Sequence, residues 1–490
     1  EPRRAGGTHP RRLSRLPLSI IHRAQHAATY VTFAMRAAAR VTSAKRAATL
    51  AIFAKCAATH VAFAMRAAAR VTFAMRAVRH AAFPMRALPH VTMAALLAFA
   101  PAARATDAVS EWAAVVDRFD RGDMSRYTIS ILFPAMHDAL NAIQPRYARW
   151  TPPAHDEPRA AGASPEAAIA AVAEIVLGGL AEGSVAQRAS LVAAALVRVP
   201  AGEARVRGLA LGRSVGMAAL RRREADGHSP FVQFSTSTRP GRWRPTPPLF
   251  GQDVVPTSGP LLFSSPASAA LVPPPPAFGS PIYRRDVEEV RRMGGRVGSR
   301  RTDAEEGSAL FWAQQVSHRG FIDAAVTLLD ARLAADRLWT SARVLALLSI
   351  GMDDAGVIIW QAKERYSFWR PVTALQEGGF GVTADAEWLP LITTPSFPEY
   401  PSGHATDCAM GGTLMTALFG DEVAFTYRSL GTRVILSQKF PSFQAAARDC
   451  SLSRIWAGVH FRETEDVSEV IGTAIAREAL RRLPPLSRGR

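Results

Sequence analysis

The sequence predicts an all-α fold, a bundle of helices interrupted by one long irregular insertion. Apolar residues recur at three- and four-residue spacing along most of residues 106–490, which is the period of an amphipathic helix. Several of these segments are rich in Ala, which favours helix and close helix packing. Alternation of apolar and polar residues, the pattern of a half-buried strand, is scarce.

The expected helices fall into two groups on either side of the insertion. Before it, the periodic segments are 108–119, 127–144, 165–182, 187–197 and 201–224. Residues 228–283 are rich in Pro, Gly, Ser and Thr, so they cannot form a long helix and should cover the surface or fold into a site. After the insertion, the periodic segments are 284–297, 303–318, 320–336, 338–362, 403–419, 442–450 and 466–482.

The formal net charge of +18 is concentrated at the N-terminus of this 490-residue chain. Residues 1–105 contain 17 Lys or Arg and one acid, whereas the rest contains 42 basic and 40 acidic residues. The charge of the whole chain is therefore no guide to the partners of residues 106–490, for which we expect no nucleic acid. No long uncharged apolar window follows residue 106, so we expect no integral membrane association. The three cysteines exclude a disulfide-dense scaffold.

Two segments precede the expected catalytic domain at 106–490. Residues 1–84 form a basic, low-complexity arm with a ten-residue repeat, which we expect to be disordered or not part of the true protein. A membrane or nucleic-acid arm and an organelle transit peptide are the alternatives. Residues 85–105 combine a basic start, an apolar run and Ala103-Arg104-Ala105, which is the pattern of a signal peptide, although a chance apolar stretch would look the same. A signal peptide would make the protein secreted or periplasmic.

Three later segments each offer groups suited to an oxyanion. In the first, Lys363 and Arg370 lie seven residues apart and could project from one helical face, with Pro371 ending or kinking that helix. Two cations on one face repel each other unless an anion lies between them. The alternative interpretation is a solvated basic face.

The second segment is Pro-Ser-Gly-His at residues 401–404, which leads from Pro-rich coil into a helix. Ser402 suits the N-cap position, where free N–H groups of the first turn can bind an anion. Gly403 allows close backbone approach, and His404 could move a proton to or from a bound ligand. An ordinary capped helix with a surface His is the alternative.

The third segment contains Arg454 and His460. The guanidinium of Arg454 offers a bidentate fork to oxyanion oxygens. His460 follows six residues later, which is not one helical face, so the backbone should turn near Gly458. A helix end with a satisfied core His is the alternative.

Taken in this order, Lys-x6-Arg-Pro, Pro-Ser-Gly-His and Ser-Arg-x5-His resemble the signature of the type 2 phosphatidic acid phosphatase (PAP2) and vanadium haloperoxidase superfamily. The surroundings resemble the vanadium-dependent haloperoxidase branch more closely. These surroundings are Asp353–Trp360, Trp369, Phe397-Pro-x-Tyr-Pro, Trp456-Ala-Gly-Val-His-Phe and Gly-Arg-Trp243-Arg-Pro. The resemblance spans most of 106–482 and implies a helical bundle that holds vanadate, or phosphate in the same site.

The resemblance also assigns roles by motif position. The residues that would bind the oxygens of the oxyanion are Lys363, Arg370, Ser402, Gly403 and Arg454. His460 would be the axial ligand of vanadium, or the nucleophile if a phosphate ester is the substrate, and His404 would be the acid or base. Trp369 and Phe397 would line the halide pocket. Chloride-oxidising members tend to carry Phe at the second of these positions and bromide-oxidising members His, which favours chloride.

One position departs from the superfamily pattern. The superfamily usually has Asp four residues after the third-motif His, where it can orient the imidazole. Here the position is Thr464, so the orienting carboxylate is displaced or replaced, and a hydroxyl alone would orient the ring more weakly.

Two cysteines flank the motifs, and their pairing is open. Cys408 lies one turn after His404, and Cys450 lies four residues before Arg454. Motifs that converge on one anion should bring these cysteines close together, so a disulfide in an exported chain and two buried thiols are both compatible with the sequence.

The leading hypothesis is a vanadate-dependent haloperoxidase, which oxidises halide with hydrogen peroxide to hypohalous acid. The alternative is a soluble acid phosphatase that hydrolyses phosphate esters through phospho-His460. A binding or structural protein with a decayed site is a third hypothesis. The sequence leaves the oligomeric state open, a homo-oligomer included.

Overall fold

The computed structural model describes residues 107–485, with gaps at 118–123, 181–182, 225, 264, 315–316, 318, 332–335, 429–435 and 484. The expected arm (1–84) and signal segment (85–105) lie outside the described residues. In chain order the described elements are α4 (Ala108–Asp117), α5 (Met124–Ile143), α6 (Pro165–Gly179), α7 (Val185–Leu196), α8 (Glu203–Arg223), β1 (Ser229–Gln233), β2 (Val254–Thr257), α9 (Ser265–Ala270), α10 (Pro281–Met293), α11 (Asp303–Ala313), α12 (Arg319–Asp330), α13 (Arg337–Tyr366), α14 (Pro371–Glu377), α15 (Gly403–Phe419), β3 (Phe425–Arg428), β4 (Ser437–Phe440), α16 (Phe443–Trp456) and α17 (Arg462–Arg482).

The all-α prediction is confirmed, because the described residues are mostly helical. Their strands form two short antiparallel pairs, β1 with β2 and β3 with β4. The short helix α14 was not expected from the sequence, and α16 extends beyond the expected 442–450.

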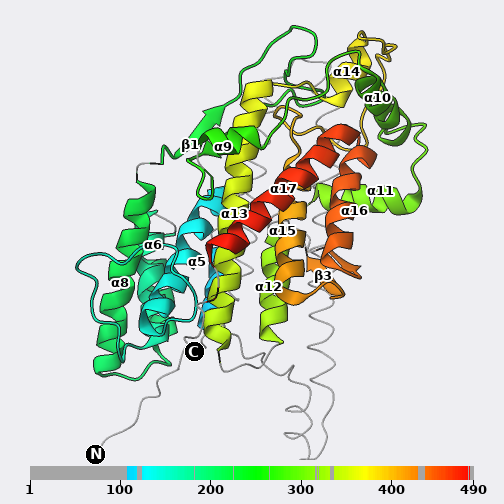
Figure 1. Ribbon diagram of the computed structural model, residues 1–490. Coiled ribbons are helices and arrows are strands. Elements are labelled where there is room, and N and C mark those ends of the chain that lie inside the picture. The colour runs from blue at the N-terminus through cyan, green and yellow to red at the C-terminus, as the bar shows by residue number, and fades with distance from the viewer. Residues whose placement is uncertain are drawn as a thin grey trace, which may run out of the picture. The chain divides into compact units, whose positions relative to one another are not determined.

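The long helix α13 organises the arrangement (Figure 1). It has 30 residues, which corresponds to a length of about 45 Å. α5, α6 and α8 lie on one side of it, and α15, α16 and α17 lie on the other. Almost every residue from Val344 to Ala362 is buried, so α13 contributes to the core along most of its length.

Close packing of small residues holds α6 against α8. α6 buries Ala167, Ala168, Ala170 and Ala171 in one run. Gly212 of α8 lies against this surface, and a Cβ at this position would collide with the carbonyl oxygen of Ala168. Gly is required there because the two backbones approach too closely for any side chain.

The irregular insertion is anchored on α13. Its Trp243 is fully buried, and the Trp243 backbone N–H donates to the Ser367 carbonyl oxygen at 2.8 Å. The backbone N–H of Leu262 donates to the Asp354 carboxylate at 2.9 Å. The insertion therefore covers the C-terminal end of α13 and the residues that follow it.

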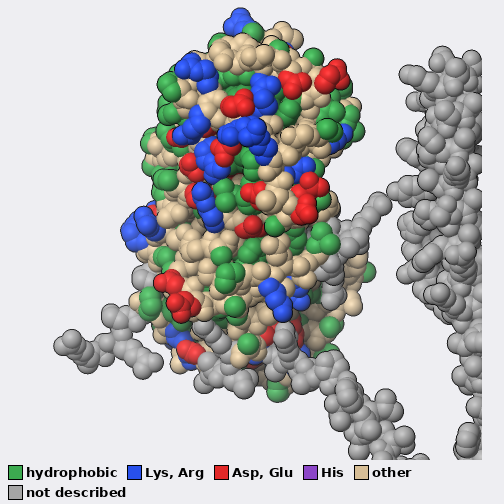
Figure 2. All heavy atoms as spheres, turned by 90° about the vertical axis from the view of Figure 1, so that its right-hand side faces the viewer, with side chains coloured by type: hydrophobic (Ala, Val, Ile, Leu, Met, Phe, Trp, Pro, Cys, Tyr) green, Lys and Arg blue, Asp and Glu red, His purple; other side chains and the backbone are tan. Residues whose placement is uncertain are grey.

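The surface is mixed in charge. On the face shown in Figure 2, basic and acidic side chains alternate without a large area of one sign. This agrees with the nearly balanced charge of residues 106–490. None of the described helices is both long and apolar enough to cross a membrane.

Candidate functional site

Lys363 and Arg370 come from two helices, not one. α13 ends at Tyr366, and Ser367 has a left-handed backbone with φ of 43°. Arg370 is the N-cap of α14, and Pro371 begins that helix. The expectation of one helix with both cations on a single face is therefore wrong. The residue before a proline is disfavoured in helical conformation, so the chain breaks and restarts here.

Both cations are fully buried and held by backbone oxygens. Lys363 Nζ donates to the carbonyl oxygens of Pro398 and Glu399 at 2.7 and 2.8 Å. Arg370 Nε donates to the carbonyl oxygen of Phe397 at 2.9 Å. The Phe397 ring centre lies 5.2 Å from Lys363 Nζ and 5.1 Å from Arg370 Cζ, which is cation–π distance. Residues 397–399 thus position both cations.

The start of α15 has the expected form of an anion-binding N-terminus. Ser402 is the N-cap, and its hydroxyl accepts a hydrogen bond from the Ala405 N–H at 3.4 Å. A Cβ placed on Gly403 would meet nothing within 4 Å, so there is open space beside the first turn. The backbone N–H groups of a helix start favour an anion in such a position.

Arg454 and His460 flank the predicted turn. α16 ends at Trp456, and Gly458 has φ of +78°, a left-handed conformation that favours Gly. The turn brings His460 against Arg370, with 3.1 Å between His460 Nε2 and Arg370 Nη1. Arg370 Nη1 also donates to the carbonyl oxygen of Val459 at 2.8 Å. The first and third sequence motifs therefore meet in space.

Several buried donors at this place lack a partner among the described residues. They are Nη2 of Arg370 and both Nε and Nη1 of Arg454. A buried N–H without a partner is costly, so it marks a place for a ligand that accepts hydrogen bonds. These cationic donors, the open space at Gly403 and the His460 imidazole fit a small tetrahedral oxyanion such as vanadate or phosphate. In the described part of the chain, no three His, Cys, Asp or Glu side chains form a ligand set for a bare metal ion.

The electrostatics of the site also favour an anion. Burial lowers the pKa of Arg370 to about 9 and that of Arg454 to about 10, and both guanidinium groups remain charged at neutral pH. Burial, and then the neighbouring Arg370, lower the pKa of Lys363 well below its usual range. Burial and the same cations lower the pKa of His460, so its imidazole is neutral. A bound oxyanion would offset the mutual repulsion of the positive charges on Lys363, Arg370 and Arg454.

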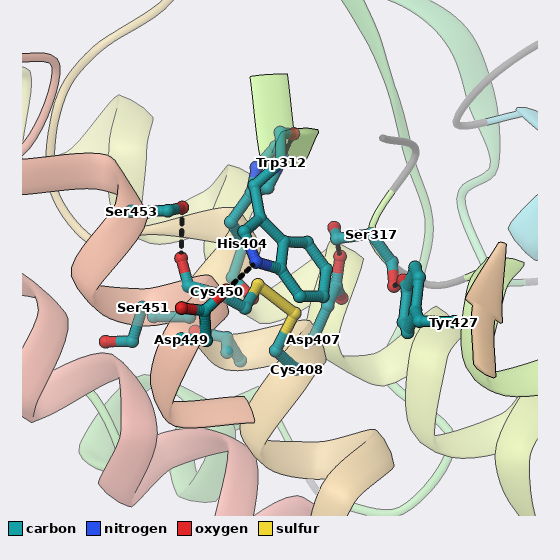
Figure 3. The surroundings of a disulfide bond; sticks show 12 residues. Trp312, Ser317, His404, Asp407, Cys408, Tyr427, Asp449, Cys450, Ser451 and Ser453 are labelled. Carbon is teal, nitrogen blue, oxygen red and sulfur yellow. Dashed lines mark hydrogen bonds between the residues drawn. A yellow bond between two sulfur atoms is a disulfide. The ribbon is translucent and has the colours of Figure 1, made fainter. Parts of the chain in front are cut away.

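His404 lies beside a disulfide bond (Figure 3). Its Nε2 is 3.2 Å from the Trp312 carbonyl oxygen, and the Trp312 indole N–H donates to Asp449 at 2.7 Å. Cys408 and Cys450 are bonded, which settles the pairing that the sequence left open. The bond joins α15, which carries His404, to α16, which carries Arg454. Burial, and then the charge of Arg454, lower the pKa of His404 well below its usual range, so the imidazole is neutral. Part of the residue is still accessible to solvent.

A buried ion pair that the sequence did not reveal fixes α15 from the other side. Arg126 of α5 donates to both carboxylate oxygens of Asp407, at 2.8 and 2.6 Å. Ser317 Oγ donates to the same carboxylate at 2.6 Å. Asp407 is three residues after His404, but nothing in its local sequence indicates a partner 281 residues away.

A carboxylate that the sequence did not identify faces His460. Glu399 is fully buried, and its Oε1 lies 2.8 Å from His460 Nδ1. Thr464 Oγ1 donates to the other carboxylate oxygen at 3.0 Å. Two features of the sequence could have identified Glu399: it is an acid inside a Pro-rich segment, and the Asp expected at position 464 is missing. A carboxylate therefore does face the ring, but it comes from the segment of the second motif.

The two residues expected to line a halide pocket have different surroundings. Phe397 is partly exposed, lies against Lys363 and Arg370, and packs edge-on against Trp360 with 5.1 Å between ring centres. Trp369 is fully buried and packs edge-on against Phe278 and Phe380. Phe397 is therefore the aromatic side chain in contact with the site cations.

The same part of the chain matches known proteins. Residues 343–489 match the family model described as the VCPO second helical-bundle domain. This range contains every residue that the sequence motifs placed in the site. This part of the chain is therefore similar to the vanadium haloperoxidase family.

The known proteins to which this chain is similar are distant from it in sequence. The vanadium chloroperoxidase of Curvularia inaequalis is 39% identical over 75 residues, which is 13% of this chain, and the match spans only 12% of that relative's length. The crystal structure of the first bacterial vanadium-dependent iodoperoxidase has a TM-score of 0.62 at 21% identity and covers 78% of this chain and 96% of its own. A bacterial vanadium-dependent chloroperoxidase in its apo form has a TM-score of 0.55 at 18% identity, over 74% of this chain and 94% of its own. These structural matches confirm the haloperoxidase fold.

Proposed function

We propose that this protein is a vanadate-dependent haloperoxidase, which oxidises a halide with hydrogen peroxide to hypohalous acid. One observation carries the proposal. Buried cationic N–H groups of Arg370 and Arg454 without partners occur together with a neutral His460 whose Nε2 faces the Arg370 guanidinium. Such a set of preorganised donors stabilises a multiply charged oxyanion.

Each residue of the site has a task in this proposal. Lys363, Arg370 and Arg454 neutralise the oxygens of the anion, and the N-terminus of α15 adds hydrogen bonds from Ser402 and Gly403. His460 offers the lone pair of Nε2 because its Nδ1 faces the Glu399 carboxylate, which can only accept when ionised. Vanadate, when bound, supplies the activation of hydrogen peroxide.

His404 has the properties of a proton carrier. It is neutral, partly accessible and located at the first turn of α15. A neutral imidazole can accept a proton from hydrogen peroxide and return it later in the reaction. Its contact with the Trp312 carbonyl oxygen keeps the ring beside the site.

The halide and the compartment form the finer part of the proposal. Phe397 beside the two cations supports chloride as a substrate, with bromide and iodide easier to oxidise. The disulfide between Cys408 and Cys450 supports an exported, oxidising location, secreted or periplasmic.

The decisive experiment is an assay of purified residues 106–490. The protein is incubated with vanadate, hydrogen peroxide and chloride, bromide or iodide, and halogenation of a dye is followed. We expect vanadate-dependent halogenation that the His404→Ala variant loses by about 100-fold or more. The exposed Arg448→Ala variant is the matched control and should keep full activity. Absence of halogenation at every vanadate concentration would contradict the proposal.

An acid phosphatase is the second candidate, since a neutral His460 Nε2 could also attack phosphorus. In that reaction His460 forms a bond to phosphorus, the bond from phosphorus to the ester oxygen breaks, and water then releases phosphate. Phosphate release from a phosphate ester, without halogenation, would favour this candidate. Vanadate should then act only as an inhibitor.

A further inference from the structure

Glu399 holds an unusual place in the site. Its backbone and its side chain serve different groups. The carbonyl oxygen accepts from Lys363 Nζ at 2.8 Å, and the carboxylate oxygen Oε1 lies 2.8 Å from His460 Nδ1. Oε1 also accepts the Phe461 backbone N–H at 3.1 Å, and Oε2 accepts the Thr464 hydroxyl at 3.0 Å. The Phe461 N–H and the Thr464 hydroxyl both donate to this carboxylate.

These contacts fix the tautomer and the orientation of the His460 ring. Burial raises the pKa of the Glu399 carboxyl to about 7, although Arg370 and Lys363 oppose this shift. An ionised carboxylate can only accept, so above this pH the ring proton lies on Nδ1 and the lone pair on Nε2. The second bond, from Thr464, prevents the carboxylate from rotating away. Partners of this kind typically change the affinity of a ligand histidine by about 10–100-fold.

We infer that Glu399 is the positioning residue of His460 and that Thr464 holds the Glu399 carboxylate in place. The 3.0 Å contact shows that a carboxylate from position 399 lies within reach of the side chain at 464. Since the same carboxylate contacts both Thr464 and His460, we expect an Asp at position 464 to reach the same imidazole nitrogen. The inference rests on the proposed function only in that His460 is taken to bind the oxyanion.

The arrangement separates two parts of anion binding. Lys363 and Arg370 are held by the backbone oxygens of residues 397–399, which a change of the Glu399 side chain leaves in place. His460 depends on the side chain. Inorganic phosphate is bound by charge and hydrogen bonds, whereas vanadium can add the imidazole as a further ligand. Loss of the carboxylate should therefore weaken vanadate binding much more than phosphate binding.

The test compares Glu399→Gln, Thr464→Asp and the double variant Glu399→Gln/Thr464→Asp in the full chain. Glu469→Gln is the matched control, because Glu469 of α17 forms a surface ion pair with Arg448 of α16. Vanadate and phosphate dissociation constants are measured by equilibrium dialysis, and thermal unfolding checks that each variant is folded. The ring nitrogens of His460 are observed by NMR in histidine-labelled protein and assigned with a His460→Gln variant.

We expect Glu399→Gln to weaken vanadate binding by about 10–100-fold while phosphate binding changes by less than about threefold. The double variant should regain most of the lost affinity, and the control should match the wild type. In the NMR spectrum, the wild type should show a proton on Nδ1, and Glu399→Gln a mixture of tautomers.

Three outcomes would overturn the inference. They are unchanged vanadate affinity in Glu399→Gln, an equal loss for phosphate, and a double variant that regains nothing. If the wild type binds neither oxyanion, the proposed function fails. The tautomer measurement then still decides whether Glu399 positions His460.

Discussion

The two sides of α13 differ in what they bury: small apolar residues on one side and charged groups on the other. On one side, α6 and α8 meet through Ala and Gly, and backbones approach so closely that Gly212 allows no side chain. On the other side, the bundle of α15, α16 and α17 buries Arg454 with guanidinium nitrogens that have no partner among the described residues. Packing of the first kind contributes stability, whereas burial of unpaired charge costs stability and is retained for a ligand. Substitutions should therefore affect stability on one side and activity on the other.

The largest effect is expected from Arg454→Met. It removes a buried cation with unpaired donors, so halide oxidation should fall by about 100- to 1000-fold. The free energy of unfolding of the ligand-free protein should not fall, because an apolar side chain of similar size replaces an unsatisfied charge.

Dye halogenation and chemical denaturation measure the two quantities. Arg448→Met on the same helix is the control, because this side chain is about half exposed and pairs with Glu469. If Arg454→Met lost both stability and activity, the proposed difference between the two sides of α13 would be wrong.

Acid should weaken the fold through buried neutral histidines on both sides. Burial lowers the pKa of His137 of α5 to about 4, from 6.5. Between these values the unfolded chain binds a proton that the folded chain does not, so stability falls as the pH drops from about 6.5 to about 4. For His137 the loss is about 3 kcal/mol.

Urea denaturation at several pH values measures this loss, and the His137→Gln variant should show a shallower dependence. Burial also lowers the pKa of His460, so His460→Gln should reduce the slope independently. An unchanged slope in both variants would assign the acid sensitivity to other groups.

A smaller effect is expected from Gly212→Ala. The added Cβ collides with the Ala168 carbonyl oxygen, which should cost about 1–3 kcal/mol of stability. Activity per folded molecule should stay the same, because the site is on the other side of α13. Gly307→Ala in α11 is the control: a Cβ meets nothing within 4 Å there, and this change should stabilise the protein by about 0.5–1 kcal/mol. Equal effects of the two changes would show that α6–α8 packing is not tight.

The sequence predicted most helices because apolar spacing is a local property. It missed α14, which has seven residues, too few for a period to show. It also placed Lys363 and Arg370 on one helix, because spacing alone cannot reveal a left-handed residue such as Ser367.

In the site, the motifs identified the groups but not how they are held. The turn at Gly458 was predicted from the six-residue separation of Arg454 and His460. The contact between Glu399 and His460 joins residues 61 apart, and no periodicity encodes such a contact. The sequence indicated that the carboxylate expected at position 464 is displaced or replaced, but it could not show that Glu399 takes its place.

α13 packs against both sets of helices, and this affects how the protein unfolds. Its buried residues belong at once to the core with α5 and to the core with α15, and Lys363 lies in its last turn. If either set of helices moved away from α13, buried residues of α13 would become exposed to water. Amide hydrogens of α13 should therefore exchange among the slowest in the protein, and the two sides should unfold in one cooperative transition.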